Sequence, residues 1–208
     1  MTTLGFVFLL VALGSALWSR WRSGRVPLLL ILLLLLALGT EAMAVFFASD
    51  VRGNQWVYNL FLLLEATVLM SLVRVVGRSA LLARIALGCL VAIALMWMWE
   101  VKLEDGFFVW VNNTFVLAAL FYIVLYTIAL VSLADTVLAP LWRAPEFWLS
   151  LSVVVFFGSM IPYNGVLNHL WRTDRSLAAS LYSINEVLLC VRYGFVGVAC
   201  FLYTRAEP

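Results

Sequence analysis

Continuous apolar segments, each long enough to cross a lipid bilayer, follow one another along almost the whole chain. The hydrocarbon core of a bilayer is about 30 Å thick, so a spanning helix needs roughly 20 apolar residues. Because the backbone must satisfy its own hydrogen bonds in lipid, such segments fold as helices, whereas a β-barrel requires alternating polar and apolar residues. Spanning helices are expected at about residues 3–19, 26–48, 56–76, 84–100, 107–133, 147–168 and 177–203.

The composition indicates the same class of protein. Of the 208 residues, 65% are apolar and 12% are charged, whereas a soluble domain is about half apolar and a quarter charged. The first segment lacks a preceding basic region and a small-residue cleavage site, which favours a first helix over a cleaved leader. The sequence therefore predicts an all-α, polytopic transmembrane bundle of seven helices, with residues 1–208 forming a single domain in contact with the bilayer.

Basic residues are concentrated in alternate connections between the predicted spans. One side carries Arg20, Arg22, Arg25, Arg74, Arg78, Arg84, Arg143 and Arg205. The other side carries Arg52, Lys102, Arg172 and Arg175, interspersed with the acidic residues Asp50, Glu100, Glu104, Asp105 and Asp174. Cytoplasmic connections are rich in lysine and arginine. We therefore expect the N-terminus outside and the C-terminus in the cytoplasm.

Polar and ionisable side chains within the predicted spans are the candidates for function, because such groups are costly in lipid. With the orientation above, most of them fall in the outer halves of five helices, while the cytoplasmic halves are largely apolar. This asymmetry predicts a polar cavity that opens toward the outside or into the outer leaflet. The candidate ligand-binding residues are Glu41, Tyr58, Asn59, Glu65, Asn113, Tyr163, Asn164, Asn185, Glu186 and Arg192.

Two charged residues, Glu65 and Arg192, fall at similar depths in the third and seventh spans. An isolated charge at that depth costs about 2.5–3.5 kcal/mol, so we expect the two to form an ion pair. Tyr58 and Glu65 are seven residues apart and share a helix face, as do Asn185 and Arg192. Such a set serves one of three purposes: it holds helices together, binds a ligand, or relays protons.

Several classes of function are excluded by what the sequence lacks. It has one histidine, His169, too few for a three-histidine zinc site or a haem with two histidine ligands. Its one lysine, Lys102, falls in an outer connection and cannot form a retinal Schiff base in the last helix. There is no nucleophile elbow, phosphate-binding loop or basic surface for nucleic acid. We expect no catalytic residues, metal or other cofactor, and packing roles for Cys89, Cys190 and Cys200.

Three stretches carry a resemblance to a known group of proteins. They are Tyr58-Asn59-Leu60-Phe61 leading to Glu65, Phe147-Trp148-x-Ser150 leading to Gly158, and Ser183-Ile184-Asn185. In these the chain resembles uncharacterised bacterial seven-helix membrane proteins, which occur alone or as the membrane input region of sensor histidine kinases. The resemblance implies a multi-pass protein of the bacterial inner membrane. In the kinase versions a cytoplasmic coiled coil follows the last helix, so here signalling would require a partner membrane protein or kinase.

The sequence therefore predicts a sensor-like, receptor-like membrane protein acting in signal transduction. It would bind a small or lipidic ligand in the outer half of the bundle, where a ligand carboxylate or headgroup would compete for Arg192. Three alternatives stay open. One is a small transporter of the three-helix-repeat type that uses the same residues. The others are a lipid-modifying enzyme with Glu65, Glu186 or His169 as general base, and an accessory subunit of a membrane complex.

Overall fold

The computed structural model describes residues 3–20, 25–47, 55–77, 79–103, 110–137 and 140–205. These residues form helices joined by short connections, and no β-strand occurs among them. The elements are α1 (Thr3–Arg20), α2 (Arg25–Phe46), α3 (Gln55–Val76), α4 (Ala80–Leu103), α5 (Asn112–Thr136), a short 3-10 helix η1 (Leu141–Arg143), α6 (Pro145–Thr173) and α7 (Arg175–Arg205). The predicted all-α bundle of seven helices is confirmed.

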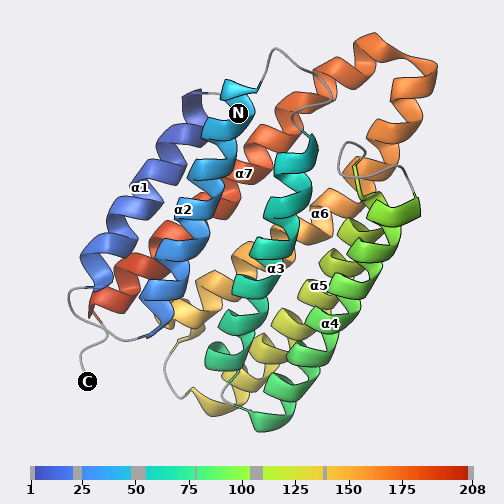
Figure 1. Ribbon diagram of the computed structural model, residues 1–208. Helices are drawn as coiled ribbons and strands as arrows, with labels where there is room; N and C mark the ends of the chain where they lie inside the picture. Colours follow the sequence, from blue (N-terminus) through green and yellow to red (C-terminus); the bar gives the residue numbers. More distant parts are fainter. Residues whose placement is uncertain are drawn as a thin grey trace.

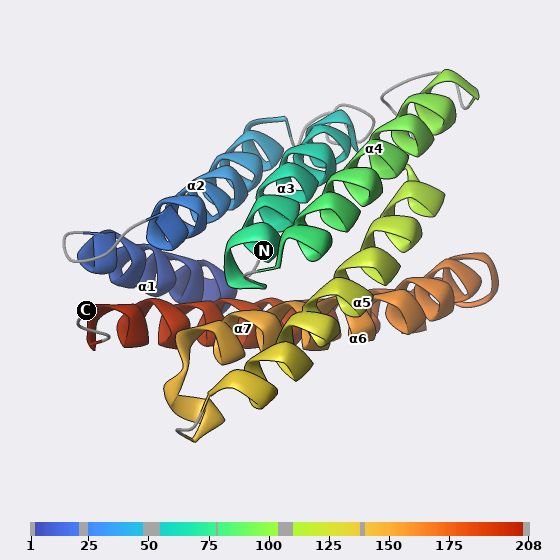
Figure 2. The same cartoon turned by 90° about the horizontal axis from the view of Figure 1, so that it is seen from below.

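The helices form a closed ring in which each packs against its neighbours in sequence, and α7 returns to pack against α1. Helices α1 to α4 run side by side across one face of the bundle, with α5, α6 and α7 behind them (Figures 1 and 2). Additional contacts join α3 to α5 and α2 to α7 across the interior. The ring therefore brings polar residues from α2, α3, α6 and α7 toward a common interior.

The outer surface of the bundle is apolar, as expected for a protein surrounded by lipid. On α4, for example, Leu81, Leu95 and Trp99 are more than half exposed. Soluble monomers rarely expose contiguous apolar patches of more than a few hundred Å². Helices α2 to α7 are each long and apolar enough to cross a membrane, whereas the apolar part of α1, Leu4–Ser19, is shorter.

Helices α6 and α7 are longer than the predicted spans of 147–168 and 177–203. They contain 29 and 31 residues, so each is about 45 Å long at 1.5 Å per residue. The connection expected between them is almost entirely helical. Asp174 ends α6, and its side-chain oxygen accepts hydrogen bonds from the backbone N–H groups of Ser176 and Leu177 at 3.0 and 3.1 Å. This N-cap starts α7 at once, so the two helices extend beyond the other helices at this end (Figure 1).

The start of α4 also differs from the prediction of a span over 84–100. Helix α4 begins at Ala80, where the Ser79 hydroxyl oxygen accepts a hydrogen bond from the Leu82 backbone N–H at 3.4 Å. Gly77 ends the preceding turn, and a Cβ atom there would lie 2.2 Å from a Leu82 methyl carbon. The connection between α3 and α4 is therefore shorter than hydropathy alone indicates, because a glycine and a capping serine allow a tight turn.

Candidate functional site

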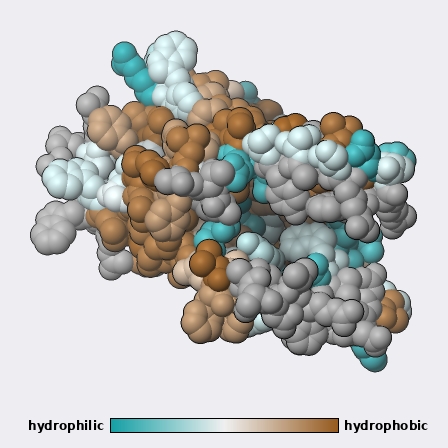
Figure 3. All heavy atoms as spheres, turned by 90° about the horizontal axis from the view of Figure 1, so that it is seen from above, coloured by the Kyte–Doolittle hydropathy of each residue, from teal (hydrophilic) through white to brown (hydrophobic). Residues whose placement is uncertain are grey.

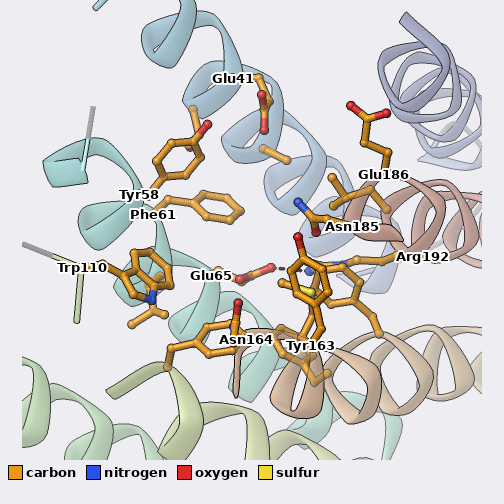
Figure 4. Close-up of a pocket in the computed structure, with 18 of the residues that line it drawn as sticks. Glu41, Tyr58, Phe61, Glu65, Trp110, Tyr163, Asn164, Asn185, Glu186 and Arg192 are labelled. Carbon is orange, nitrogen blue, oxygen red and sulfur yellow. Dashed lines mark hydrogen bonds and ion pairs between the residues drawn. The ribbon is translucent and has the colours of Figure 1, made fainter. Parts of the chain in front are cut away.

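A cavity of about 470 Å³ lies inside the ring, bounded mainly by α2, α3, α6 and α7 and closed at one side by the start of α5. Eight of the ten candidate residues line it, and they approach it from four different helices (Figure 4). They are Glu41, Tyr58, Glu65, Tyr163, Asn164, Asn185, Glu186 and Arg192. Residues dispersed over most of the sequence therefore share one cavity wall.

The cavity occupies the half of the bundle that contains the α2–α3 and α6–α7 connections. Its wall includes Gln55 and Tyr58 in the first turns of α3, and on α7 it runs from Asn185 to Tyr193. Viewed onto this end, polar side chains gather around a hollow between groups of apolar ones (Figure 3). The polar cavity expected in one half of the bundle is thus present, at the end where α1 begins (Figure 1).

An ion pair between Glu65 on α3 and Arg192 on α7 forms the inner end of the cavity (Figure 4). Both residues are buried, with 6% and 5% of their surface exposed. The Arg192 guanidinium carbon also lies 4.6 Å from the ring centroid of Phe156 and 5.3 Å from that of Phe157. The ion pair expected from equal depth in the membrane is confirmed, and aromatic rings add to the stabilisation of its cation.

The guanidinium of Arg192 retains unused hydrogen-bonding capacity. It has five N–H donors, and within the described ranges its one hydrogen bond goes from Nη2 to Oε1 of Glu65. Arg192 lines the cavity, so its remaining donors are available to an acceptor that enters. The same arginine therefore joins two helices and presents polar groups to the cavity.

Two candidate residues, Asn59 and Asn113, lie outside the cavity wall. The side-chain oxygen of Asn59 accepts a hydrogen bond from the Val111 backbone N–H at 3.3 Å, and its backbone oxygen accepts one from Trp97 Nε1 at 3.0 Å. Asn113 is exposed, and its backbone N–H donates to Glu100. These two residues hold the start of α5 against α3 and α4.

Glu100 is buried, although its position in the sequence indicates an acidic residue of the outer side. Its carboxylate accepts hydrogen bonds from the backbone N–H groups of Asn113 and Thr114 at 3.0 and 2.8 Å, and from the Thr114 hydroxyl at 2.7 Å. A carboxylate at a helix N-terminus satisfies free N–H groups and complements the helix dipole. Because Trp110 and Phe115 flank this point and line the cavity, Glu100 positions one side of it.

Beyond the ion pair the interior is filled by side chains. Tyr122 and Phe157 pack with ring centroids 4.7 Å apart, and Leu69 and Met70 on α3 are fully buried. The Tyr126 hydroxyl donates a hydrogen bond to the Leu69 backbone oxygen at 3.0 Å and joins α5 to α3. The polar cavity therefore ends at Glu65 and Arg192, and a packed core follows.

These two tyrosines give a matched test of that core. Tyr126→Phe removes a buried hydrogen bond and should lower the free energy of unfolding by about 1 kcal/mol. Tyr122→Phe removes a buried hydroxyl with no hydrogen-bond partner in the described residues, so it should be neutral or slightly stabilising. Unfolding by SDS titration in mixed micelles measures both, and a larger loss for Tyr122→Phe than for Tyr126→Phe would contradict the assignment.

The described residues contain no group of three or more His, Cys, Asp or Glu side chains that could hold a metal ion. The three cysteines are free thiols on α4 and α7. Comparisons with protein-family models, curated proteins and solved structures give no match to this chain. The function must therefore be inferred from the cavity itself.

Proposed function

We propose that this protein is a sensor-like membrane protein that binds a small or lipidic ligand in the cavity and signals through a partner. The observation that carries the proposal is that eight of the ten predicted polar or ionisable candidates converge on one cavity in a largely apolar bundle. Structural contacts alone do not require a cavity of about 470 Å³, which falls within the range of about 300–1,000 Å³ common for ligand sites.

The Glu65–Arg192 ion pair is the proposed switch. A ligand that engages the free donors of Arg192, or the carboxylate of Glu65, changes the balance between paired and separated states. Arg192 lies in the middle of α7, which packs along both α1 and α6. A shift of α7 would therefore carry a change in the cavity to the opposite end of the bundle, where a partner membrane protein or kinase would detect it.

The orientation proposed from the arginines puts the cavity on the outside of the cell. Four arginines lie at the end of the bundle away from the cavity. Arg20 and Arg74 are near the ends of α1 and α3, and Arg25 and Arg84 are near the starts of α2 and α4. With that end cytoplasmic, the N-terminus is outside and the C-terminus inside. The cavity of an inner-membrane protein would then sample the periplasmic side or the outer leaflet.

A transporter built on the same residues is the alternative, and the packed interior favours the sensor. Below the ion pair, Leu69, Met70, Leu72, Tyr122 and Tyr126 are almost completely buried. Transport requires the site to open to both sides of the membrane in turn, and this cavity lies in one half. Substrate counterflow in proteoliposomes distinguishes the two functions, and we expect none.

Native mass spectrometry of protein released from nanodiscs tests ligand binding. The variant Asn185→Trp fills the cavity from α7, whereas Ile184→Trp adds the same side chain at a neighbouring exposed position. We expect wild type and Ile184→Trp to carry the same small molecule or lipid, and Asn185→Trp to lose it. An empty wild-type spectrum, or equal retention by Asn185→Trp, would contradict the proposal and favour a purely structural polar cluster.

A further inference from the structure

Aromatic rings form much of the apolar wall of the cavity. Eight of its 21 lining residues are aromatic, whereas 14% of the whole chain is aromatic. Tyr58, Phe61 and Trp110 lie on one side of the cavity, and Tyr163 lies on the other (Figure 4). The negative face of an aromatic ring attracts cations, and several rings around one space are the usual means of binding an ammonium ion.

Acidic side chains outnumber basic ones in the same wall. Three lining residues are acidic, Glu41, Glu65 and Glu186, and Arg192 is the basic one. The charge of Arg192 is balanced by Glu65. Glu186 makes no hydrogen bond or ion pair with any residue in the described ranges. Glu186 is therefore the carboxylate that a positive charge supplied by the ligand would neutralise.

We infer that the ligand carries an ammonium group attached to a compact apolar body. This inference rests on the proposed function and specifies its ligand class. The ammonium group would lie near Glu186 and the aromatic rings, where partial exclusion of water strengthens both attractions. An anionic ligand would meet Glu186 as a like charge, and the charge of Arg192, whose free donors it could still reach, is already balanced by Glu65.

The cavity already stabilises one cation in the proposed way. The guanidinium of Arg192 lies over the rings of Phe156 and Phe157 while a carboxylate neutralises it. A ligand ammonium in the cavity would use the same kind of combination, with Glu186 as the carboxylate and the aromatic rings of the wall as the second attraction. The volume of about 470 Å³ is at the smaller end for ligand sites, which favours a single compact amine over a whole two-chain lipid.

Three probes that differ in one group test the inference. They are 4-phenylbutylamine, 4-phenylbutanol and 4-phenylbutanoate, which share an apolar body and carry a positive, a neutral and a negative head group at neutral pH. Titration calorimetry on the full protein in nanodiscs of neutral lipid gives their dissociation constants. We expect the amine to bind at least about tenfold more tightly than the alcohol, and the carboxylate to bind most weakly.

A charge-matched pair of variants locates the effect. Glu186→Gln should remove most of the preference for the amine over the alcohol. Asp135→Asn removes one negative charge from an exposed position near the other end of α5 and should leave the preference unchanged. Because Glu186 has no structural partner among the described residues, Glu186→Gln is expected to unfold at the same SDS fraction as wild type.

The results distinguish failure of the cationic ligand from failure of the cavity as a binding site. Equal or tighter binding of the alcohol or carboxylate overturns the cationic ligand, as does an unchanged amine preference in Glu186→Gln. A native ligand without an amine in the wild-type mass spectrum also overturns the cationic ligand. Each of these three results leaves the cavity as a binding site. Failure of all three probes together with an empty wild-type spectrum overturns the binding site as well.

Discussion

Replacing Glu65 with alanine is expected to lower the free energy of unfolding by about 3 kcal/mol, because it leaves the Arg192 guanidinium buried without a counter-charge. Both residues are at least nine-tenths buried, so water that enters the cavity replaces only a part of the interaction with the lost carboxylate. The two rings near Arg192 offset a part of the loss, since each lies within about 6 Å of the cation. SDS unfolding in mixed micelles measures the difference from wild type.

The double variant Glu65→Leu/Arg192→Met distinguishes two contributions to the free energy of unfolding: the stabilisation by the ion pair and the cost of leaving one charge buried alone. Replacing both members of a buried ion pair by apolar residues of similar volume is often neutral, so the double variant should recover most of the stability. It should nevertheless lose the bound molecule, if the ion pair is the ligand switch. Arg84→Gln, at an exposed position, controls for loss of charge and should change stability by less than about 0.5 kcal/mol. A double variant as unstable as Glu65→Ala would contradict this account.

The fold was predictable because lipid imposes a simple rule on the sequence. Continuous apolar segments identify the helices, since no other element satisfies its backbone there. The boundaries that differ most from the prediction are the start of α4, the start of α5, which is Asn112 instead of residue 107, and the end of α6. Asp174 and Ser79 are polar and look like parts of connections, but their side chains cap helices and shorten those connections. Hydropathy reflects the free energy of transferring a side chain from water to lipid, and it does not report whether a polar side chain caps a helix.

The ion pair was predictable for a related reason. Depth along a helix follows from counting residues, and two opposite charges at equal depth in lipid have few alternatives to pairing. The rotation of each helix about its axis was harder to predict. Asn59 lies one residue after Tyr58, so the two point in different directions: Tyr58 lines the cavity, whereas Asn59 contacts Val111. Single polar residues near a helix end do not reveal which neighbour they face.

Glu100 was missed because acidic residues near the end of a span are usually solvated. The one available signal was the run Asn112-Asn113-Thr114 at the start of the next apolar segment, which begins a helix with free N–H groups. A carboxylate on the preceding helix is well placed to bind them, but only if the connection folds back over it. That requirement concerns tertiary structure and was not available from spacing.

Glu100→Ala should lower the free energy of unfolding by about 2–3 kcal/mol, because it leaves the N–H groups of Asn113 and Thr114 without their acceptor. Glu100→Gln keeps one side-chain oxygen and should lose about half as much. Hydrogen exchange adds a local measurement: the amides of Asn113 and Thr114 should exchange faster in Glu100→Ala, while the amide of Tyr126 keeps its protection. Uniformly faster exchange along α5 would show that Glu100 stabilises the whole helix instead of its start.

The same substitution should weaken binding in the cavity, although Glu100 does not line it. Trp110 and Phe115 flank the capped turn and lie 5.8 Å apart, measured between ring centroids. Loosening that turn lets both rings move, so we expect the affinity for 4-phenylbutylamine to fall several-fold in Glu100→Ala. Lys102→Ala, at an exposed position in the same turn of α4, should change neither stability nor affinity. The affinity of a cation site formed by aromatic faces depends on the positions of the rings. Unchanged affinity in Glu100→Ala would therefore show that Trp110 and Phe115 contribute nothing to binding.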